Sequence, residues 1–223
     1  MNATYYTNNR RRFYEKMKPD SLAVLFSGQE IRRSADDFYP FFAERNFVYL
    51  TGLSCKEAVF LAVKDGQGAV SERLYLLPPD AMAERWTGRR VKPAEAEQIS
   101  GIRDVRFLDA FEGELQKLLE SGNYGTCYLD LFRTAPQDIA RPAHYLAQQL
   151  KARWPELEIP DACAILRYLR TIKSPEEIQA LREAEKKTKA GILAMMQASK
   201  PGMYEYQYKA EFDRALGQFG PEG

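Results

Sequence analysis

The amino-acid sequence predicts an α/β fold in which helices pack on the faces of a sheet. Strand-sized apolar runs, several of them ended by glycine or proline, alternate with segments of helical periodicity up to about residue 160. This alternation is typical of sheets whose connections cross their faces as helices. Beyond residue 170 the pattern changes to long helices that no strand follows, which predicts a second structural part.

The first part of the chain is predicted to begin with a helix and to continue as strands. The helix covers about residues 7–17, because Phe13 and Met17 lie four residues apart on one face and Thr7 or a neighbouring asparagine can cap it. Pro19 then ends the helix. Apolar runs predict buried strands in four segments, at 21–28, 46–51, 58–63 and 73–77.

The middle of the chain is predicted to alternate between helices and shorter strands. Leu115, Leu118 and Leu119 share one stripe, which indicates an amphipathic helix over 111–119. Another helix is predicted over 142–154, and the proline residues at 155 and 160 end it. The remaining predicted elements are short helices around Trp86 and over 94–99, and strands at 105–108 and 126–129.

The last quarter of the chain has a strong helix start. Ser174 is followed by Pro175 and, three residues on, by Glu177, which together form a capping box with proline in the first turn. A long helix and a second one over about 205–216 follow, and the first has apolar positions at Ile178, Leu181, Ile192, Leu193 and Met196. Such an apolar stripe has to be buried. The two helices either pack back on the first part or begin a larger domain.

Composition is that of an ordinary globular protein. Of 223 residues, 45% are hydrophobic and 28% are charged, which excludes a disordered tail, a collagen repeat and a disulfide-stapled miniprotein. Lys and Arg number 32 and Asp and Glu 31, so no net field draws the chain to nucleic acid or to a membrane. We expect neither partner. Without a signal-like or membrane-spanning apolar segment, and with three cysteines that form no CxxC pair, a cytoplasmic location is expected.

The basic clusters of the sequence are predicted to be solvated surface. Arg10, Arg11 and Arg12 form one cluster, and residues 89–92 form the other. Neither cluster has the interleaved aromatic residues on which nucleic-acid bases stack. A phosphate or nucleic-acid site is therefore not expected at either one.

The histidine count limits the catalytic chemistry that the chain can carry. His144 is the sole histidine, and it lies in a predicted helix, where a structural role at or near the surface is expected. A zinc site rich in histidine or a Ser-His-Asp triad would have to include this residue. The carboxylates of the last quarter lie among Lys and Arg, as on solvated helix faces. We therefore assign no catalytic residue and no metal ligand in this chain.

Several sequence blocks, in this order and spacing, resemble a known family. Residues 32–41, 45–52, 57–59 and 83–90 are similar to the N-terminal domain of Xaa-Pro aminopeptidase (aminopeptidase P). Residues 172–178, with 200–205 downstream, are similar to the entry into the catalytic "pita-bread" domain of that family. The resemblance covers nearly the whole chain.

The resemblance implies a creatinase-type N-terminal fold, a mixed sheet flanked by helices, over residues 1–170. Residues 171–223 would then be the first helices of a truncated pita-bread metallopeptidase domain. In this family two divalent metal ions, commonly manganese, are held by two aspartates, one histidine and two glutamates. The resemblance places these ligands beyond Gly223, so the parent enzyme would cleave Xaa-Pro bonds whereas this chain alone would be inactive. The parent would be a homo-oligomer, a dimer or tetramer, acting on peptides.

The resemblance also implies substrate-groove residues, in some cases contributed to a neighbouring subunit: Trp86, Asp36 and Tyr39. Read from the residues alone, Trp86 is either a core anchor or, given its charged neighbours, part of a wet segment. Asp36 and Asp37 are adjacent and on a strand would point to opposite faces, so they could not share a metal. A salt bridge from this pair to Arg33 or Arg45 is the structural alternative.

Two other functions stay open from the sequence. The same architecture is used without metal in a histone-chaperone subunit and in other interaction proteins, so a non-enzymatic binding module is one alternative. A Xaa-Pro dipeptidase or a creatinase is the other. The presence or absence of the five metal ligands downstream of residue 223 would separate the binding module from the enzymes.

Overall fold

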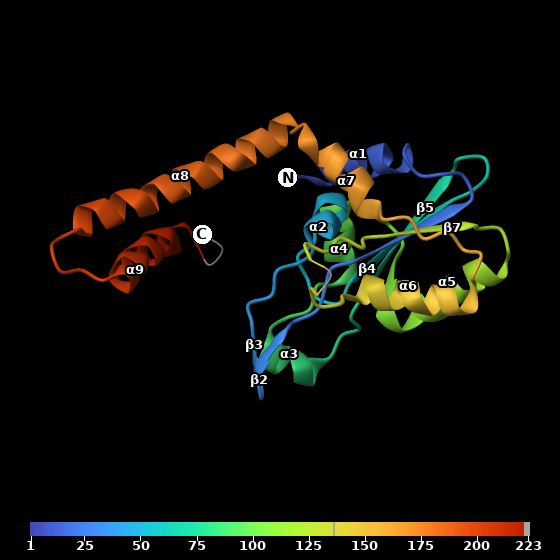
Figure 1. Ribbon diagram of the computed structural model, residues 1–223, viewed down its shortest axis with the longest axis horizontal. Coiled ribbons are helices and arrows are strands. Elements are labelled where there is room, and N and C mark those ends of the chain that lie inside the picture. Colours follow the sequence, from blue (N-terminus) through green and yellow to red (C-terminus); the bar gives the residue numbers. More distant parts are fainter. Residues whose placement is uncertain (136, 221–223) are drawn as a thin grey trace. The chain divides into compact units, whose positions relative to one another are not determined.

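The computed structural model describes residues 1–135 and 137–220, which form two compact units (Figure 1). Unit 1 is Met1–Thr171 and unit 2 is Ile172–Gly223. Unit 1 contains a sheet covered by helices, and unit 2 is helical. The expected α/β class is confirmed. The assignment of unit 2 to the beginning of a catalytic domain stays a prediction.

The main sheet has five strands in the order β6-β5-β4-β1-β7, and it is mixed. The central strand β4 is antiparallel to both of its neighbours, β1 and β5, while each edge strand lies parallel to its neighbour. The mixed sheet that the resemblance implied is thus confirmed. The strand bounds are β1 Ser21–Phe26, β4 Val59–Lys64, β5 Val70–Leu76, β6 Val105–Phe107 and β7 Thr126–Leu129.

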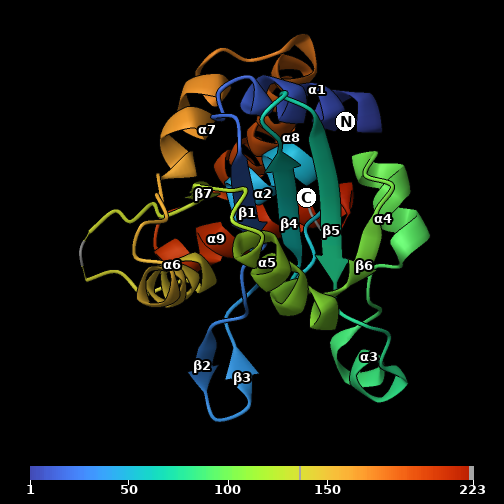
Figure 2. The ribbon, with the colours of Figure 1, turned by 90° about the vertical axis from the view of Figure 1, so that its right-hand side faces the viewer.

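Alternation along the buried strands builds a core on each face of the sheet. Leu22 and Val24 of β1 belong to one core, and Ala23 and Leu25 belong to the other. Helices α5 (Phe111–Glu120, after the 3₁₀ turn Leu108–Ala110) and α6 (Pro142–Arg153) cover the face of Leu22. The opposite face is covered by α1 (Ala3–Tyr14), α2 (Arg45–Thr51), α4 (Pro93–Ser100) and α7 (Ala162–Thr171) (Figure 2).

The strand predicted at 46–51 is wrong, because this segment is the helix α2. Phe47 and Leu50 are buried, and so are most of their neighbours in the helix. A short run that is buried nearly all round has no period that separates a strand from a helix. The helix ends at Gly52, which has φ of +76° and donates its N–H to the carbonyl of Val48 at 2.8 Å.

The first helix and its arginines also differ from the prediction. Asn2 caps α1 by accepting a hydrogen bond from the N–H of Tyr5 at 3.1 Å, so Thr7 lies inside the helix. Arg10 is fully buried, whereas Arg11 is exposed as expected. The Arg10 guanidinium donates to the carbonyl oxygens of Leu50 and Ser100 at 2.8 and 2.9 Å. It therefore ties α1 to α2 and α4.

The sequence prediction did not include two elements of unit 1. One is the exposed hairpin of β2 (Arg32–Ser34) and β3 (Asp37–Phe38), and the other is α7. The predicted helix around Trp86 is present as α3 (Ala81–Thr87). No helix in the described ranges, 1–135 and 137–220, is long and apolar enough to cross a membrane.

Unit 2 consists of α8 (Pro175–Ala198), α9 (Glu205–Leu216) and a 3₁₀ turn at Gly217–Phe219. The predicted capping box is confirmed, since Ser174 donates its N–H to Glu177 at 2.8 Å and accepts the Glu177 N–H at 3.3 Å. Gly191 of α8 packs against the ring of Phe212 in α9 so closely that a Cβ atom would lie 2.5 Å from it. Apolar side chains nevertheless remain exposed on unit 2: Ile178, Leu181, Ile192, Leu193 and Met196.

Candidate functional site

The three residues expected in a substrate groove lie on two projections from one edge of the main sheet. Pairing of Phe26 with Val59, and of Val59 with Tyr75, brings the ends of β1 and β5 to the same edge. The β2–β3 hairpin follows β1, and α3 follows β5. Figures 1 and 2 both show these projections at the lower end of unit 1, and Figure 2 shows that they are separate.

The hairpin carries Asp36 and Tyr39 into solvent. Asp36 lies in the turn between the strands and is exposed. Its neighbour Asp37 pairs with Arg33 at 3.5 Å, which confirms the salt bridge for one aspartate of the pair. The N–H of Tyr39 donates to the carbonyl of Ile31 at 3.0 Å, and the Arg33 guanidinium lies 5.9 Å from the centre of the Tyr39 ring. Tyr39 is thus held at the base of the hairpin with 54% of its surface exposed.

Helix α3 presents Trp86, whose surface is 82% exposed. The alternative that Trp86 is an anchor in the hydrophobic core of this chain is therefore wrong. Asp80 caps the helix by accepting the N–H groups of Met82 and Ala83, both at 3.0 Å, and these bonds lower the pKa of Asp80. Gly88, with φ of +87°, ends the helix directly after Thr87. A short, capped helix thus holds an indole ring in solvent.

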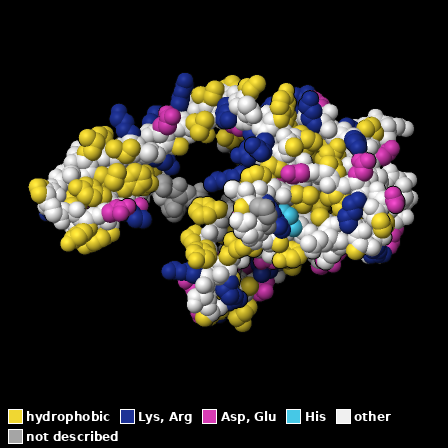
Figure 3. Space-filling view, in the orientation of Figure 1, with side chains coloured by type: hydrophobic (Ala, Val, Ile, Leu, Met, Phe, Trp, Pro, Cys, Tyr) yellow, Lys and Arg dark blue, Asp and Glu magenta, His cyan; other side chains and the backbone are white. Residues whose placement is uncertain are grey.

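Exposed apolar side chains gather on the two projections, and we call this set the tip surface. Figure 3 shows hydrophobic side chains at the lower end of unit 1. Large exposed apolar groups that cluster in this way mark sites of association or ligand binding. The tip surface consists of Ile31, Phe38, Tyr39, Phe42, Met82 and Trp86.

A cavity of about 230 Å³ lies between the bases of the two projections. Phe41 and Cys55 line it from one side, and Thr87 and Arg90 line it from the other. Burial raises the pKa of the Cys55 thiol to about 11, so the thiol stays protonated near neutral pH and is a poor nucleophile. The tip surface and this cavity therefore offer binding groups and no activated nucleophile.

His144 has the structural role that the sequence predicted. It lies half-buried in the first turn of α6. Its Nδ1 accepts the N–H of Arg141 at 3.0 Å, and its Nε2 lies 3.2 Å from the carbonyl oxygen of Leu131. With Nδ1 as acceptor, the proton is on Nε2 and is donated to that carbonyl. Both ring nitrogens are thus bound to the backbone.

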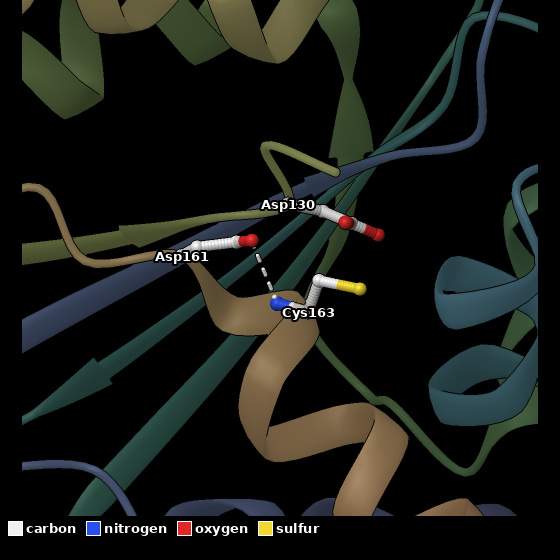
Figure 4. A group of neighbouring side chains, drawn as sticks. All are labelled: Asp130, Asp161 and Cys163. Carbon is white, nitrogen blue, oxygen red and sulfur yellow. Dashed lines mark hydrogen bonds between the residues drawn. The ribbon is translucent and has the colours of Figure 1, made fainter. Parts of the chain in front are cut away.

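Within the described residues, one group of possible metal ligands comes together: Asp130, Asp161 and Cys163, within 4.8 Å of one another (Figure 4). Asp161 caps α7, because its Oδ1 accepts the N–H group of Cys163 at 2.9 Å, and the same oxygen accepts the N–H group of Leu131, also at 2.9 Å. Asp130 accepts the Asn46 amide at 2.8 Å. Sequence reasoning missed this group because β7 and α7 bring together residues that no short motif connects.

The protonation of this group does not suit a metal ion. Burial raises the pKa of both Asp130 and Cys163, which favours their neutral forms. A metal requires the thiolate and the carboxylate. Figure 4 shows the Cys163 thiol directed away from Asp161. The cluster therefore has a structural role: Asp161 caps α7, and Asp130 accepts a hydrogen bond from Asn46.

The chain is similar to known proteins along nearly its whole length. The family model described as aminopeptidase P, N-terminal domain, matches residues 6–128. The Xaa-Pro aminopeptidase of Haemophilus influenzae is 30% identical over 218 residues, which covers 96% of this chain and 48% of that protein. The chain spans about half the length of the curated relatives it matches.

Solved structures show the same similarity. The structure described as an aminopeptidase P from Bacillus anthracis matches with a TM-score of 0.93 and 33% identity, over 99% of this chain and 52% of that one. Zinc-substituted aminopeptidase P from E. coli in complex with product matches with a TM-score of 0.83 and 26% identity, over 99% and 50%. The fold of both units thus has counterparts in solved proteins.

Proposed function

The chain belongs to the aminopeptidase P N-terminal domain family, and from this premise we propose that it is the N-terminal part of a metal-dependent Xaa-Pro aminopeptidase. Such an enzyme is a hydrolase that removes an N-terminal residue preceding proline. The observation that carries the proposal is the similarity to Xaa-Pro aminopeptidases over 96% of this chain. The names of these relatives favour an aminopeptidase over a binding module, a dipeptidase or a creatinase.

We assign substrate selection, rather than bond cleavage, to this chain. The tip surface exposes Trp86 and Tyr39 in a capped helix and a hairpin, where they can form one wall of a groove. A wall built from fixed aromatic rings narrows a groove and orders a peptide against it. In a homo-oligomer, a dimer or tetramer, the same side chains would be buried against a neighbouring subunit. Their exposure in the single chain supports this arrangement.

Cleavage is proposed to depend on divalent metal ions held outside this chain. A related structure is described as zinc-substituted, and we propose two ions, with manganese as the metal in the parent enzyme. A metal pair would supply an activated water at neutral pH. The donor set described here does not fit such a pair, because Asp161 is bound to backbone N–H groups and the Cys163 thiol is protonated. No catalytic step is therefore assigned to these residues.

A cytoplasmic location is proposed for the protein. Cys55, Cys127 and Cys163 are free thiols, and two of them are buried. Unpaired cysteines are typical of a reducing compartment. Burial raises the pKa of the Cys127 thiol to about 12, which protects it further from oxidation.

The proposal is tested with a chimeric enzyme in which residues 1–223 replace the corresponding half of E. coli aminopeptidase P. In this chimera Trp86→Ala should lower kcat/KM for a Xaa-Pro peptide by roughly tenfold, since a positioning contact is lost. Thermal unfolding should not change, because Trp86 is exposed. Tyr168→Ala is the matched control, as Tyr168 is an exposed aromatic residue of α7.

Equal kcat/KM for the Trp86→Ala chimera and its parent would contradict a substrate-selecting role of the tip surface. Sedimentation of the isolated chain gives a test that does not need the chimera to fold. The wild type should self-associate more than the double variant Trp86→Ala and Tyr39→Ala. Identical sedimentation of both as monomers would argue against an oligomer formed through this surface.

A further inference from the structure

Helices α5 and α6 lie beside each other on one face of the sheet (Figure 2). A groove is lined by side chains of both helices. Its volume is about 820 Å³, within the range of ligand-binding clefts. Both helices line it with side chains three and four residues apart, so one face of each helix is turned to it. The lining is mainly apolar and includes Phe26, Leu108, Phe111, Leu115, Leu146 and Trp154.

One end of the groove is acidic. Glu57 lies two residues before the first residue of β4. Asp109 and Glu112 lie around the start of α5, which follows β6. Val59 pairs with Tyr75 and Leu76 pairs with Phe107, so the start of β4 and the end of β6 lie at the same end of the sheet. The three acidic residues that follow or precede these strand ends therefore line the groove from that end. The N–H of Glu57 donates to the carbonyl oxygen of Gly28 at 2.9 Å, but in the described part of the chain none of the three side-chain carboxylates has a hydrogen-bond or ion-pair partner.

Glu57 is the most informative of these residues. It is half-buried and has φ of +56°, in the left-handed region that non-glycine residues rarely adopt. Asp109 and Glu112 also stabilise the positive end of the α5 dipole, but Glu57 lies outside any helix. The helix dipole therefore does not account for all of the negative charge at this end.

At the opposite end of the groove, the positive charge of the lining residue Arg153 is neutralised. The Arg153 guanidinium pairs with Glu120 at 2.6 Å and lies 4.7 Å from the centre of the Trp154 ring. The groove therefore has an acidic end, an apolar length and a neutralised far end. This distribution is complementary to a ligand with a positive charge at one end and an apolar body.

We propose that this groove is a docking site for a partner peptide segment in which a basic side chain is followed by apolar residues. The basic group would lie among Glu57, Asp109 and Glu112, and the apolar side chains would lie along α5 and α6. From Phe111 to Leu119 the helix rises about 12 Å, the span of about four extended residues. This site is separate from the tip surface and goes beyond the proposed aminopeptidase function.

Tryptophan fluorescence gives a direct test, because the chain has two tryptophans and one of them lines the groove. In the variant Trp86→Phe the remaining signal comes from Trp154 alone. The probe is the blocked peptide acetyl-Arg-Leu-Ala-Leu-Phe-amide, and the control peptide has Glu in place of Arg. The Arg peptide should change the Trp154 signal with saturation and bind at least tenfold more tightly. Added salt should reduce this difference.

Two charge variants place the peptide in the groove. Glu112→Lys and Glu57→Gln should each weaken binding of the Arg peptide at least fivefold. Glu97→Lys is the matched control, because Glu97 is exposed on α4, which covers the other face of the sheet. Circular dichroism checks that each variant is folded. If Glu112→Lys does not fold, Glu57→Gln alone decides the test.

Equal affinity for the two peptides, or an unchanged affinity in the carboxylate variants, would overturn the proposal. Self-association of the chain that buries Trp154 and is not reversed by the Arg peptide would also overturn it. The groove would then bind a second copy of the chain. The probe contains no proline. Failure of this test would therefore leave the proposed function unaffected.

Discussion

Glu72 of β5, itself half-buried, neutralises the fully buried Arg10 of α1, with the Arg10 Nε 3.0 Å from the Glu72 Oε1. The same carboxylate oxygen accepts the hydroxyl of Tyr14 at 2.7 Å. Burial and the nearby Glu72 raise the pKa of Tyr14 well above its ordinary value, so this hydroxyl remains a donor. The first helix is therefore held to the sheet by a charged pair and a shared hydrogen bond.

Glu72→Gln should lower the free energy of unfolding by about 3 kcal/mol, because it leaves the buried Arg10 charge without its counter-ion. Urea unfolding followed by circular dichroism measures the loss. The matched control is Glu15→Gln, which removes the exposed partner of Arg11 and should cost less than about 0.5 kcal/mol. Similar losses in both variants would show that the Arg10 pair contributes no more than a surface pair.

Gly52→Ala should destabilise unit 1 for two reasons that can be separated. Its φ of +76° strains any L side chain, and an added Cβ would lie 2.4 Å from the Tyr6 ring. Gly122 has a similar φ of +73° but open space around the added atom, so Gly122→Ala measures strain alone, at about 1 kcal/mol. Gly52→Ala should lose clearly more. Equal losses would mean that Tyr6 moves aside freely.

His144→Gln should cost less than about 2 kcal/mol of unfolding free energy. Glutamine in the first turn of α6 can still accept a hydrogen bond from the N–H of Arg141, as the histidine does. Thermal unfolding together with metal titration checks this expectation. A larger loss would reveal a stronger role for the bond to Leu131.

The backbone amides of α8 and α9 should exchange hydrogen faster than those of β1 and β4. Ile192, Leu193 and Met196 are exposed on unit 2, whereas Val24 and Phe60 are buried in the sheet. Fewer buried contacts mean a lower free energy of local opening. Hydrogen exchange with mass spectrometry on the dilute chain compares the two regions. Equal protection would show that unit 2 is stable without any further contact.

How much the sequence predicts depends on whether a signal is local. The run at residues 21–28 is apolar on both faces and ends at a glycine, so the buried strand β1 could be predicted from it. The run at 46–51 is just as apolar but is short and buried nearly all round, and the wrong element was predicted. The burial of Arg10 follows from partners 40 to 90 residues away, which no local pattern shows.

The candidate site was predictable only through resemblance. Trp86, Asp36 and Tyr39 have no spacing that indicates a groove, and their positions relative to a substrate were implied by the family. The exposure of Trp86 could be expected from its charged neighbours, whose burial without partners would be costly. In contrast, the groove between α5 and α6 arises from tertiary packing of two helices that the sequence predicted separately.

Assay of the 223-residue chain with a fluorogenic Xaa-Pro peptide and added manganese tests most directly the claim that this chain selects substrate without cleaving it. Calorimetric titration of the same preparation with manganese and zinc accompanies the assay, and E. coli aminopeptidase P is the positive control. Hydrolysis requires a metal-activated water and a proton donor for the leaving nitrogen, and the described residues hold no fitting donor set. We predict no turnover and only weak, non-stoichiometric metal binding. Turnover that persists after host peptidases are removed, or stoichiometric binding at micromolar metal, would contradict the account.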